Sequence, residues 1–183
     1  MAFSANTTWM AWMVLMASSE AVASVFDFRP SVVVHDRSLH LVGKTPFVAG
    51  LFFKIYEAGL YLDKRPVHAE GIVEKPLYLE LVYSRPIKAQ QFRDAANSIL
   101  EAILPQEKLA QYGELIEAVH ESYQDVKEGD RYGLSSVPGK GLTLFLNDRE
   151  VIHIPDDGFA RDYLQIWLGD HRNAEKMKKG LLP

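Results

Sequence analysis

The sequence Gly43-Lys44-Thr45 has the composition of the end of a phosphate-binding loop, in which the lysine reaches the phosphates and the hydroxyl binds Mg²⁺. The full motif also needs a glycine five positions before Gly43, because the backbone amides of a glycine-rich turn surround the phosphates. Ser38 stands at that position, within an apolar segment that resembles a strand. The sequence therefore does not favour nucleotide binding.

Metal binding and nucleophilic catalysis also find little support. The chain has no cysteine, which excludes thiolate ligands, disulfides and cysteine nucleophiles. The six histidines do not have the spacing that places a metal-binding pair on one helix face, so we predict no metal site and no cofactor. A composite metal or haem site built from distant histidines remains an alternative. The motif G-x-S-x-G is absent, and Ser135 and Ser136 lie in a turn-like segment where serine is common.

Length and net charge limit the number of domains and the kinds of partner that the chain is expected to have. With 183 residues, 48% of them hydrophobic and 24% charged, the chain is long enough for one substantial core and predicts a single domain. The formal net charge of -4 shows no basic excess of the kind that nucleic-acid binding leaves in a sequence. We therefore predict no nucleic-acid partner.

The first 23 residues differ in composition from the rest. They contain no Lys or Arg, carry the apolar run WMAWMVLMA, and end in Ala21-Val22-Ala23, a small-x-small cleavage pattern. The run is far shorter than the roughly 20 residues needed to cross a bilayer. We predict an export signal at 1–23 and one domain at 24–183, periplasmic or secreted, without a stable membrane span after cleavage. Because the signal lacks basic residues, a membrane-anchored or buried N-terminal helix is the alternative.

The elements that would position a site follow one another in blocks. Apolar or alternating segments rich in β-formers predict strands at 31–35, 38–42, 47–62 and 77–83. Apolar residues at helical spacing then predict helices at 88–104 and 105–123. Strands at 131–134, 142–146 and 151–154 and helices at 157–168 and 173–181 complete the chain. Blocks in this order predict an α+β fold with a largely antiparallel sheet.

The segment Leu51 to Leu62, LFFKIYEAGLYL, has apolar side chains at odd and even positions alike, so a strand would carry them on both of its faces. A sheet with helices on one face usually leaves its other face to water, so the second face of this strand also needs an apolar cover. Either more protein or a ligand cavity would provide it. Lys54 and Glu57 are three residues apart, so a regular strand points them to opposite faces, and we do not expect them to pair.

Three sequence stretches together carry a family resemblance. FFKIYEAGLYL, GDRYGLSSVPGKGLTLFLN and GFARDYLQIWLG, the last followed by a short helix ending in KKGLL, occur in this order. They resemble the bacterial chalcone isomerase-like proteins, an exported branch of the chalcone isomerase superfamily, over residues 39–182. The resemblance implies a chalcone isomerase-like open-faced β-sandwich. In that fold a large, mostly antiparallel sheet carries a helix layer on one face, and the long strand forms the floor of a ligand cleft.

The same resemblance identifies positions that correspond to the active site of the enzymes. Their arginine, which stabilises an enolate, corresponds to Lys44 or, with a shorter loop, to Val48, and neither is arginine. Lysine supplies charge but lacks the planar guanidinium fork. No catalytic residue is therefore assigned, and Lys44 and Tyr56 are the weak candidates.

The remaining corresponding positions are mostly apolar. A strand threonine of the enzymes corresponds to Tyr56, a helix tyrosine to Phe92, an asparagine to Ile99, and the residue before the glycine of the last helix to Ile166. These substitutions imply an apolar cleft, although apolar residues on helix faces are also ordinary core residues. The predicted ligand-binding residues are Lys44, Val48, Lys54, Tyr56, Phe92, Ile99, Ile166 and Trp167.

Two main classes of function follow from the resemblance. The preferred one is an exported, non-catalytic protein that holds a fatty acid or similar lipophile in the cleft. The alternative is an isomerase, an intramolecular lyase with an altered site in which Lys44 or Tyr56 donates a proton. Haem binding is a weaker alternative that requires His120 or His153 to face the cleft.

Overall fold

The computed structural model describes residues 26–49, 53–64 and 71–182, so the predicted export signal lies outside the described residues. Seven strands form one antiparallel sheet whose spatial order equals their order in the chain. The strands are β1 (Ser31–Val34), β2 (Arg37–Ala49), β3 (Phe53–Leu62), β4 (Leu77–Tyr83), β5 (Arg131–Val137), β6 (Gly141–Leu146) and β7 (Arg149–Ile154). Such a meander needs only local connections, apart from the helical excursion between β4 and β5.

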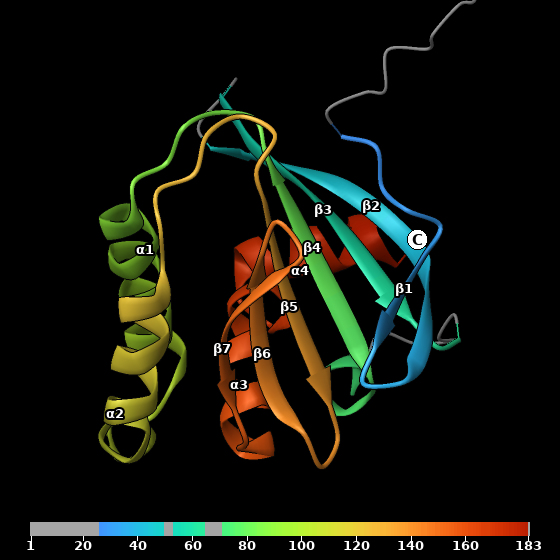
Figure 1. Ribbon diagram of the computed structural model, residues 1–183. Coiled ribbons are helices and arrows are strands. Elements are labelled where there is room, and N and C mark those ends of the chain that lie inside the picture. Colours follow the sequence, from blue (N-terminus) through green and yellow to red (C-terminus); the bar gives the residue numbers. More distant parts are fainter. Residues whose placement is uncertain (1–25, 50–52, 65–70, 183) are drawn as a thin grey trace, which may run out of the picture.

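In the described part of the chain, four α-helices and a short 3-10 helix, η1 (Ile72–Glu74), complete the α+β fold. The helices are α1 (Ala89–Ile103), α2 (Gln106–Ser122), α3 (Asp157–Leu168) and α4 (Arg172–Leu181). The C-terminal helices cover one face of the curled sheet, with α3 against β5 and β6 and α4 against β2 and β3, while α1 and α2 lie side by side near β7 (Figure 1). Among the described residues, no helix is both long and apolar enough to cross a membrane.

The predicted elements agree with the structure except at two places, the long apolar run and the segment of Ser135 and Ser136, which was expected to be a turn but belongs to β5, where both serines are buried. The single strand predicted at 47–62 is wrong: Phe47 to Ala49 end β2, and β3 begins at Phe53 and runs back beside it. Phe47 therefore pairs with Tyr56, a residue of the same predicted run. The apolar character of both strands concealed their boundary, because periodicity does not distinguish one long strand from two that pair with each other.

The helix face of the sheet carries the main hydrophobic core. Leu60, Leu79 and Leu134 alternate with residues of the other face and are almost fully buried, as are Phe159 and Leu164 of α3. The alternation follows from the strand geometry, in which successive side chains point to opposite faces. This core holds α3 and α4 on the sheet, and the two helices in turn form one wall of the space described below.

The second face of the sheet is closed by the chain itself. In Figure 1 the strands pass in front of α3 and α4, so the view looks onto this second face. A smaller cluster of Val32, Leu39, Tyr61, Tyr78 and Val137 fills it. Phe28 packs on Gly59, where a Cβ atom would lie 2.5 Å from the ring. The second apolar face of β3 is therefore covered by other parts of the protein and not by a cavity.

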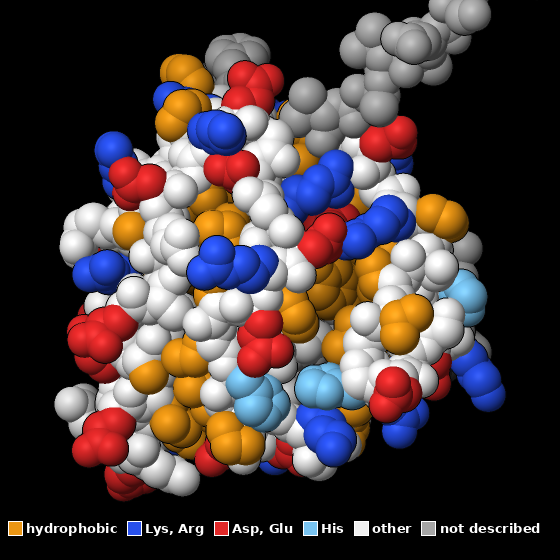
Figure 2. Space-filling view, viewed as in Figure 1, with side chains coloured by type: hydrophobic (Ala, Val, Ile, Leu, Met, Phe, Trp, Pro, Cys, Tyr) orange, Lys and Arg blue, Asp and Glu red, His pale blue; other side chains and the backbone are white. Residues whose placement is uncertain are grey.

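An ionic network ties the segment before β1 to the second face. Glu80 of β4 is fully buried, and its carboxylate accepts hydrogen bonds from Arg29, Arg131 and the hydroxyl of Tyr61, each at 3.2 Å. Arg29 also contacts Asp148 at 2.7 Å. Figure 2 shows Lys or Arg and Asp or Glu side chains close together beside hydrophobic ones near the middle of this face. Because a buried carboxylate is tolerated only when it is paired, the network fixes the N-terminal segment across the sheet.

Candidate functional site

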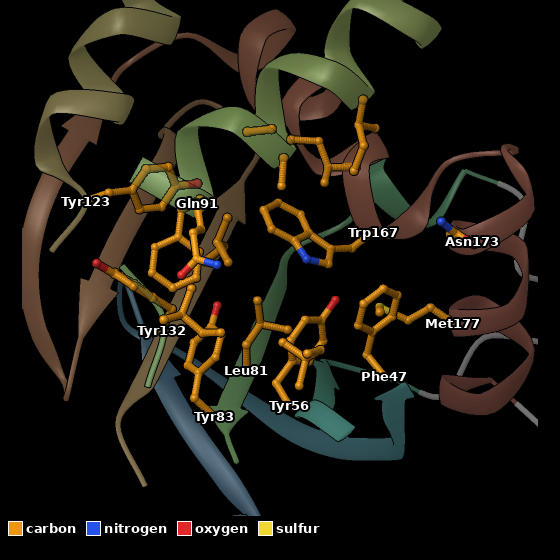
Figure 3. Close-up of a pocket in the computed structure, with 18 of the residues that line it drawn as sticks. Phe47, Tyr56, Leu81, Tyr83, Gln91, Tyr123, Tyr132, Trp167, Asn173 and Met177 are labelled. Atoms are coloured by element: carbon orange, nitrogen blue, oxygen red, sulfur yellow. The ribbon is translucent and has the colours of Figure 1, made fainter. Parts of the chain in front are cut away.

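A cavity of about 290 Å³ lies between the helix face of the sheet and the helices. Five strands form its floor, and α1, α3 and α4 contribute its walls (Figure 3). The lining residues are Phe47, Ile55, Tyr56, Leu81, Tyr83, Ile87, Gln91, Phe92, Ala95, Ala96, Ile99, Tyr123, Tyr132, Leu134, Leu144, Ile166, Trp167, His171, Asn173 and Met177. Most are aliphatic or aromatic, which is the composition of a site for a small apolar ligand.

A β-bulge at the start of β3 shapes the floor of the cavity. The register passes from the pair Val48 and Lys54 directly to the pair Phe47 and Tyr56, so Ile55 is an extra residue. Ile55 and Tyr56 both line the cavity as a result, which a regular strand would not allow. The bulge also bends the strand where the cavity needs space.

The bulge overturns the expectation for Lys54 and Glu57. With one extra residue between them, both side chains point to the second face, and the Lys54 ammonium lies 2.7 Å from the Glu57 carboxylate. Lys54 also lies over the ring of Phe26, 3.7 Å from its centroid. The pair is therefore formed, contrary to the prediction from regular strand alternation, and it lies away from the cavity.

Aromatic rings pack edge to face along the floor. Tyr83 is 5.7 Å from Tyr56, 5.3 Å from Phe92 and 6.1 Å from Tyr132, measured between ring centroids. Phe47 stacks on Tyr56 at 4.9 Å. Such contacts restrict the rotation of each ring, so the hydroxyl groups of the tyrosines have fixed positions in the cavity wall.

The other tyrosine hydroxyls in the wall interact with groups of the protein. Tyr56 interacts with Trp167, which acts to lower the pKa of the phenol against the larger effect of burial. The hydroxyls of Tyr123 and Tyr163 lie 2.8 Å apart, and Tyr132 accepts from the backbone N–H of Gln124 at 2.8 Å. Burial raises the pKa of the Tyr56, Tyr123 and Tyr132 phenols above their ordinary value, so all three stay neutral at physiological pH.

Tyr83 differs from these three tyrosines. Its side chain is 4% exposed, and the described part of the chain offers no hydrogen-bond partner to its hydroxyl, which points into the cavity in Figure 3. Burial, followed by the neighbouring tyrosines, raises the pKa of this phenol well above its ordinary value. The hydroxyl is a neutral polar group on a largely apolar floor of the cavity.

Polar groups of the helices also line the cavity. Gln91 accepts a hydrogen bond from the backbone N–H of Lys88 through its Oε1, at 3.0 Å, and so satisfies a backbone N–H at the start of α1. The Nε2 of His171 lies 3.0 Å from the carbonyl of Ile166 and 3.2 Å from that of Gln165. Since carbonyls only accept, this nitrogen carries the proton, and α4 is thereby connected to the end of α3.

Five of the predicted site residues meet in the cavity. Tyr56 comes from β3, Phe92 and Ile99 from α1, and Ile166 and Trp167 from the end of α3. These elements lie far apart in the sequence, and helical spacing brings Phe92 and Ile99 to one face of α1. Their role in ligand binding remains a prediction.

The other three predicted residues lie outside the lining. Lys44 pairs with Gly59 and Val48 with Lys54, and directly opposed residues share a face, so all three side chains belong to the second face. Val48 is 44% exposed there. Neither position that corresponds to the catalytic arginine of the enzymes therefore contributes to the cavity.

The histidines proposed for haem do not line the cavity either. His120 is buried beside Tyr123 at the end of α2, and burial lowers its pKa. The Nδ1 of His153 lies 2.9 Å from the hydroxyl of Thr143 on the second face. The histidine that does line the cavity is His171, and its Nε2 is committed to backbone carbonyls. No group of three or more His, Asp or Glu among the described residues has the arrangement of a metal site.

Sequence reasoning missed several lining residues. The sequence places Tyr83 and Tyr132 in predicted strands and Tyr123 at the end of a predicted helix, but it gives none of them a role in a site. The strand patterns placed Tyr83 and Tyr132 correctly on β4 and β5, but they did not identify the face that opens on a cavity.

Comparisons with known proteins agree with this architecture. The sequence matches the chalcone isomerase-like family over residues 20–183, and the chain belongs to that family. No curated protein matches the sequence. The fold is similar to the crystal structure of a fatty-acid binding protein from Arabidopsis thaliana, with a TM-score of 0.58, 15% sequence identity, and coverage of 83% of this chain and 95% of that chain. The predicted family and fold class are therefore confirmed.

Proposed function

We propose that this protein is an exported, non-catalytic binding protein that holds a fatty acid or a similar lipophile in the cavity between sheet and helices. The observation that carries the proposal is the cavity itself, which aliphatic and aromatic side chains line on all its elements. Ligand sites of this kind are concave, mostly apolar and largely preformed. The similarity in fold to a fatty-acid binding protein supports the same class of ligand.

The size of the cavity favours a single slender molecule. A volume of about 290 Å³ lies near the lower end of ordinary ligand pockets, which span roughly 300 to 1,000 Å³. One acyl chain fits this description better than a lipid with two chains. The aromatic floor formed by Phe47, Tyr56 and Tyr83 offers flat apolar surfaces against which a methylene chain packs.

The isomerase alternative receives less support from the geometry. Lys44, one of its two candidate proton donors, points to the second face. Tyr56 lines the cavity, but burial raises its phenol pKa, and a phenol that holds its proton more tightly is a weaker acid. An enolate also needs several converging donors.

Native mass spectrometry of protein purified without detergent tests the proposal directly. We expect a discrete adduct that solvent extraction releases as a single-chain lipophile, or uptake of dodecanoic acid or dodecanol when these are added. An apo mass with no uptake of either compound would contradict the proposed function.

A matched pair of variants locates the bound molecule. Ile99→Asp places a carboxylate in the wall of the cavity and should abolish uptake, because an acyl chain cannot replace the water around that charge. Ser98→Asp adds the same charge to the exposed side of the same helix and should bind like the wild type. Equal uptake by both variants would place the ligand elsewhere.

A further inference from the structure

The floor of the cavity contains a tyrosine hydroxyl that has no hydrogen-bond partner among the described residues. The ring of Tyr83 packs against the rings of Tyr56, Phe92 and Tyr132, and the residue is 4% exposed. No hydrogen bond to this hydroxyl exists among the described residues. The hydroxyl faces the space of the cavity rather than the packed core, so it is a polar group that a bound molecule can reach.

The neighbouring hydroxyls show that the arrangement is particular to Tyr83. Tyr123 is hydrogen-bonded to Tyr163 and Tyr132 to the backbone of Gln124, and Tyr56 interacts with Trp167. For Tyr83 no such interaction with a hydrogen-bonding group is found among the described residues. Its hydroxyl can therefore both donate a hydrogen bond to a guest molecule and accept one from it (Figure 3).

We propose that Tyr83 is the head-group contact of the cavity, and that the ligand enters with an uncharged oxygen group, such as an alcohol, an ester or a protonated carboxyl, directed at this hydroxyl. This inference rests on the proposed lipophile-binding function. A chain that entered with its methyl end first would leave the Tyr83 hydroxyl unsatisfied, whereas an oxygen at this depth forms the missing hydrogen bond.

The surroundings of Tyr83 select against a charged head group. The lining residues include no Lys, Arg, Asp or Glu. A carboxylate moved into such a site gives up its hydration and gains one neutral hydrogen bond, which does not compensate. The raised pKa of the Tyr83 phenol has the same origin, since burial disfavours the negative form of the residue itself.

The titratable groups facing Tyr83 do not change their charge in the pH range of the test. They are Tyr56 on β3, Tyr123 after α2 and Tyr132 on β5, and burial raises the pKa of each. His171 at the start of α4 also lines the cavity. A neutral ligand of the same chain length controls for any effect of His171.

The first test compares dodecanol with dodecanoic acid on the purified full chain at pH 6 and pH 8, with affinities measured by titration calorimetry. Dodecanol should bind equally at both pH values. The acid should weaken by about tenfold per pH unit, because the binding-competent neutral form is depleted above the carboxyl pKa. Equal or tighter binding of the acid at pH 8 would overturn the inference while leaving the lipophile function intact. Failure of the wild type to bind either probe would overturn both.

The second test compares Tyr83→Phe with Tyr61→Phe. Tyr83→Phe removes the cavity hydroxyl and should weaken dodecanol binding by about tenfold, with no loss of thermal stability, because no intramolecular hydrogen bond is lost. Tyr61→Phe removes a hydroxyl bonded to Glu80 on the second face and should do the reverse, lowering stability and leaving affinity unchanged. Unchanged dodecanol affinity in Tyr83→Phe would refute the head-group role.

Discussion

The two faces of the sheet solve the same packing problem in opposite ways. Strands β3, β4 and β5 send alternate side chains to both faces, and both are lined with tyrosine. On the second face the polar groups converge on Glu80, and the chain's own N-terminal segment closes the surface. On the helix face the tyrosines line a cavity, and the hydroxyl of Tyr83 has no hydrogen-bond partner within the described ranges. The packed second face stabilises the fold, and the cavity on the helix face leaves room for a ligand.

Strong alkali should act on both faces at once and has the largest expected effect. The pKa values of all eight tyrosines are raised above 10 in the folded protein, mainly by burial. The unfolded chain loses these protons near pH 10 and the folded chain retains them, so the free energy of unfolding decreases as pH rises above about 10. Circular dichroism and absorbance at 295 nm should change together in one transition. Gradual phenolate formation near pH 10 in still-folded protein would contradict this expectation.

Glu80→Ala should weaken the packing of the second face strongly and should change ligand binding on the helix face little. Removing the buried carboxylate leaves Arg29 and Arg131 without their shared partner, and we expect a loss of about 3 kcal/mol in the free energy of unfolding. Asp148→Ala removes the exposed partner of Arg29 and should lower it by less than about 1 kcal/mol. Urea unfolding measures both. If Glu80→Ala also abolished lipophile uptake at a temperature where it is folded, the two faces would not be independent.

Leu79 and Leu81 allow the comparison within one strand and one face. Both are buried side chains of β4, but Leu81 lines the cavity and Leu79 is packed in the solid core. Leu79→Ala should cost about 3 kcal/mol and Leu81→Ala about 2 kcal/mol, because a side chain beside a void has fewer contacts to lose. Thermal and urea unfolding measure the difference. Equal losses would indicate that the cavity floor is as closely packed as the core.

Lys54→Ala should have the smallest effect. The Lys54 and Glu57 side chains are 34% and 16% exposed, and such a pair contributes up to about 1 kcal/mol. Affinity for dodecanol should not change, since both side chains point away from the cavity. A loss of affinity would show that the second face contributes to the site after all.

The sequence predicts the elements of this fold better than their relation to the cavity. Helical spacing identified the face of α1 that carries Phe92 and Ile99, and the family resemblance added Tyr56, Ile166 and Trp167. The placement of Lys54 failed because one extra residue at Ile55 reverses the strand alternation, and the sequence has no clear signal for such a bulge. The role of Tyr83 was equally hidden, because which of several buried tyrosines lacks a partner is decided by tertiary contacts.

The in-order arrangement of the strands also has a consequence for how the chain folds. Most neighbouring strands are joined by short connections and pair early at little entropic expense, whereas β4 and β5 must close a loop that contains α1 and α2. This closure joins the two halves of the sheet and brings the wall formed by α1 over the floor formed by β4 and β5. We therefore expect the cavity to form in the slowest step, together with the last pairing of the sheet.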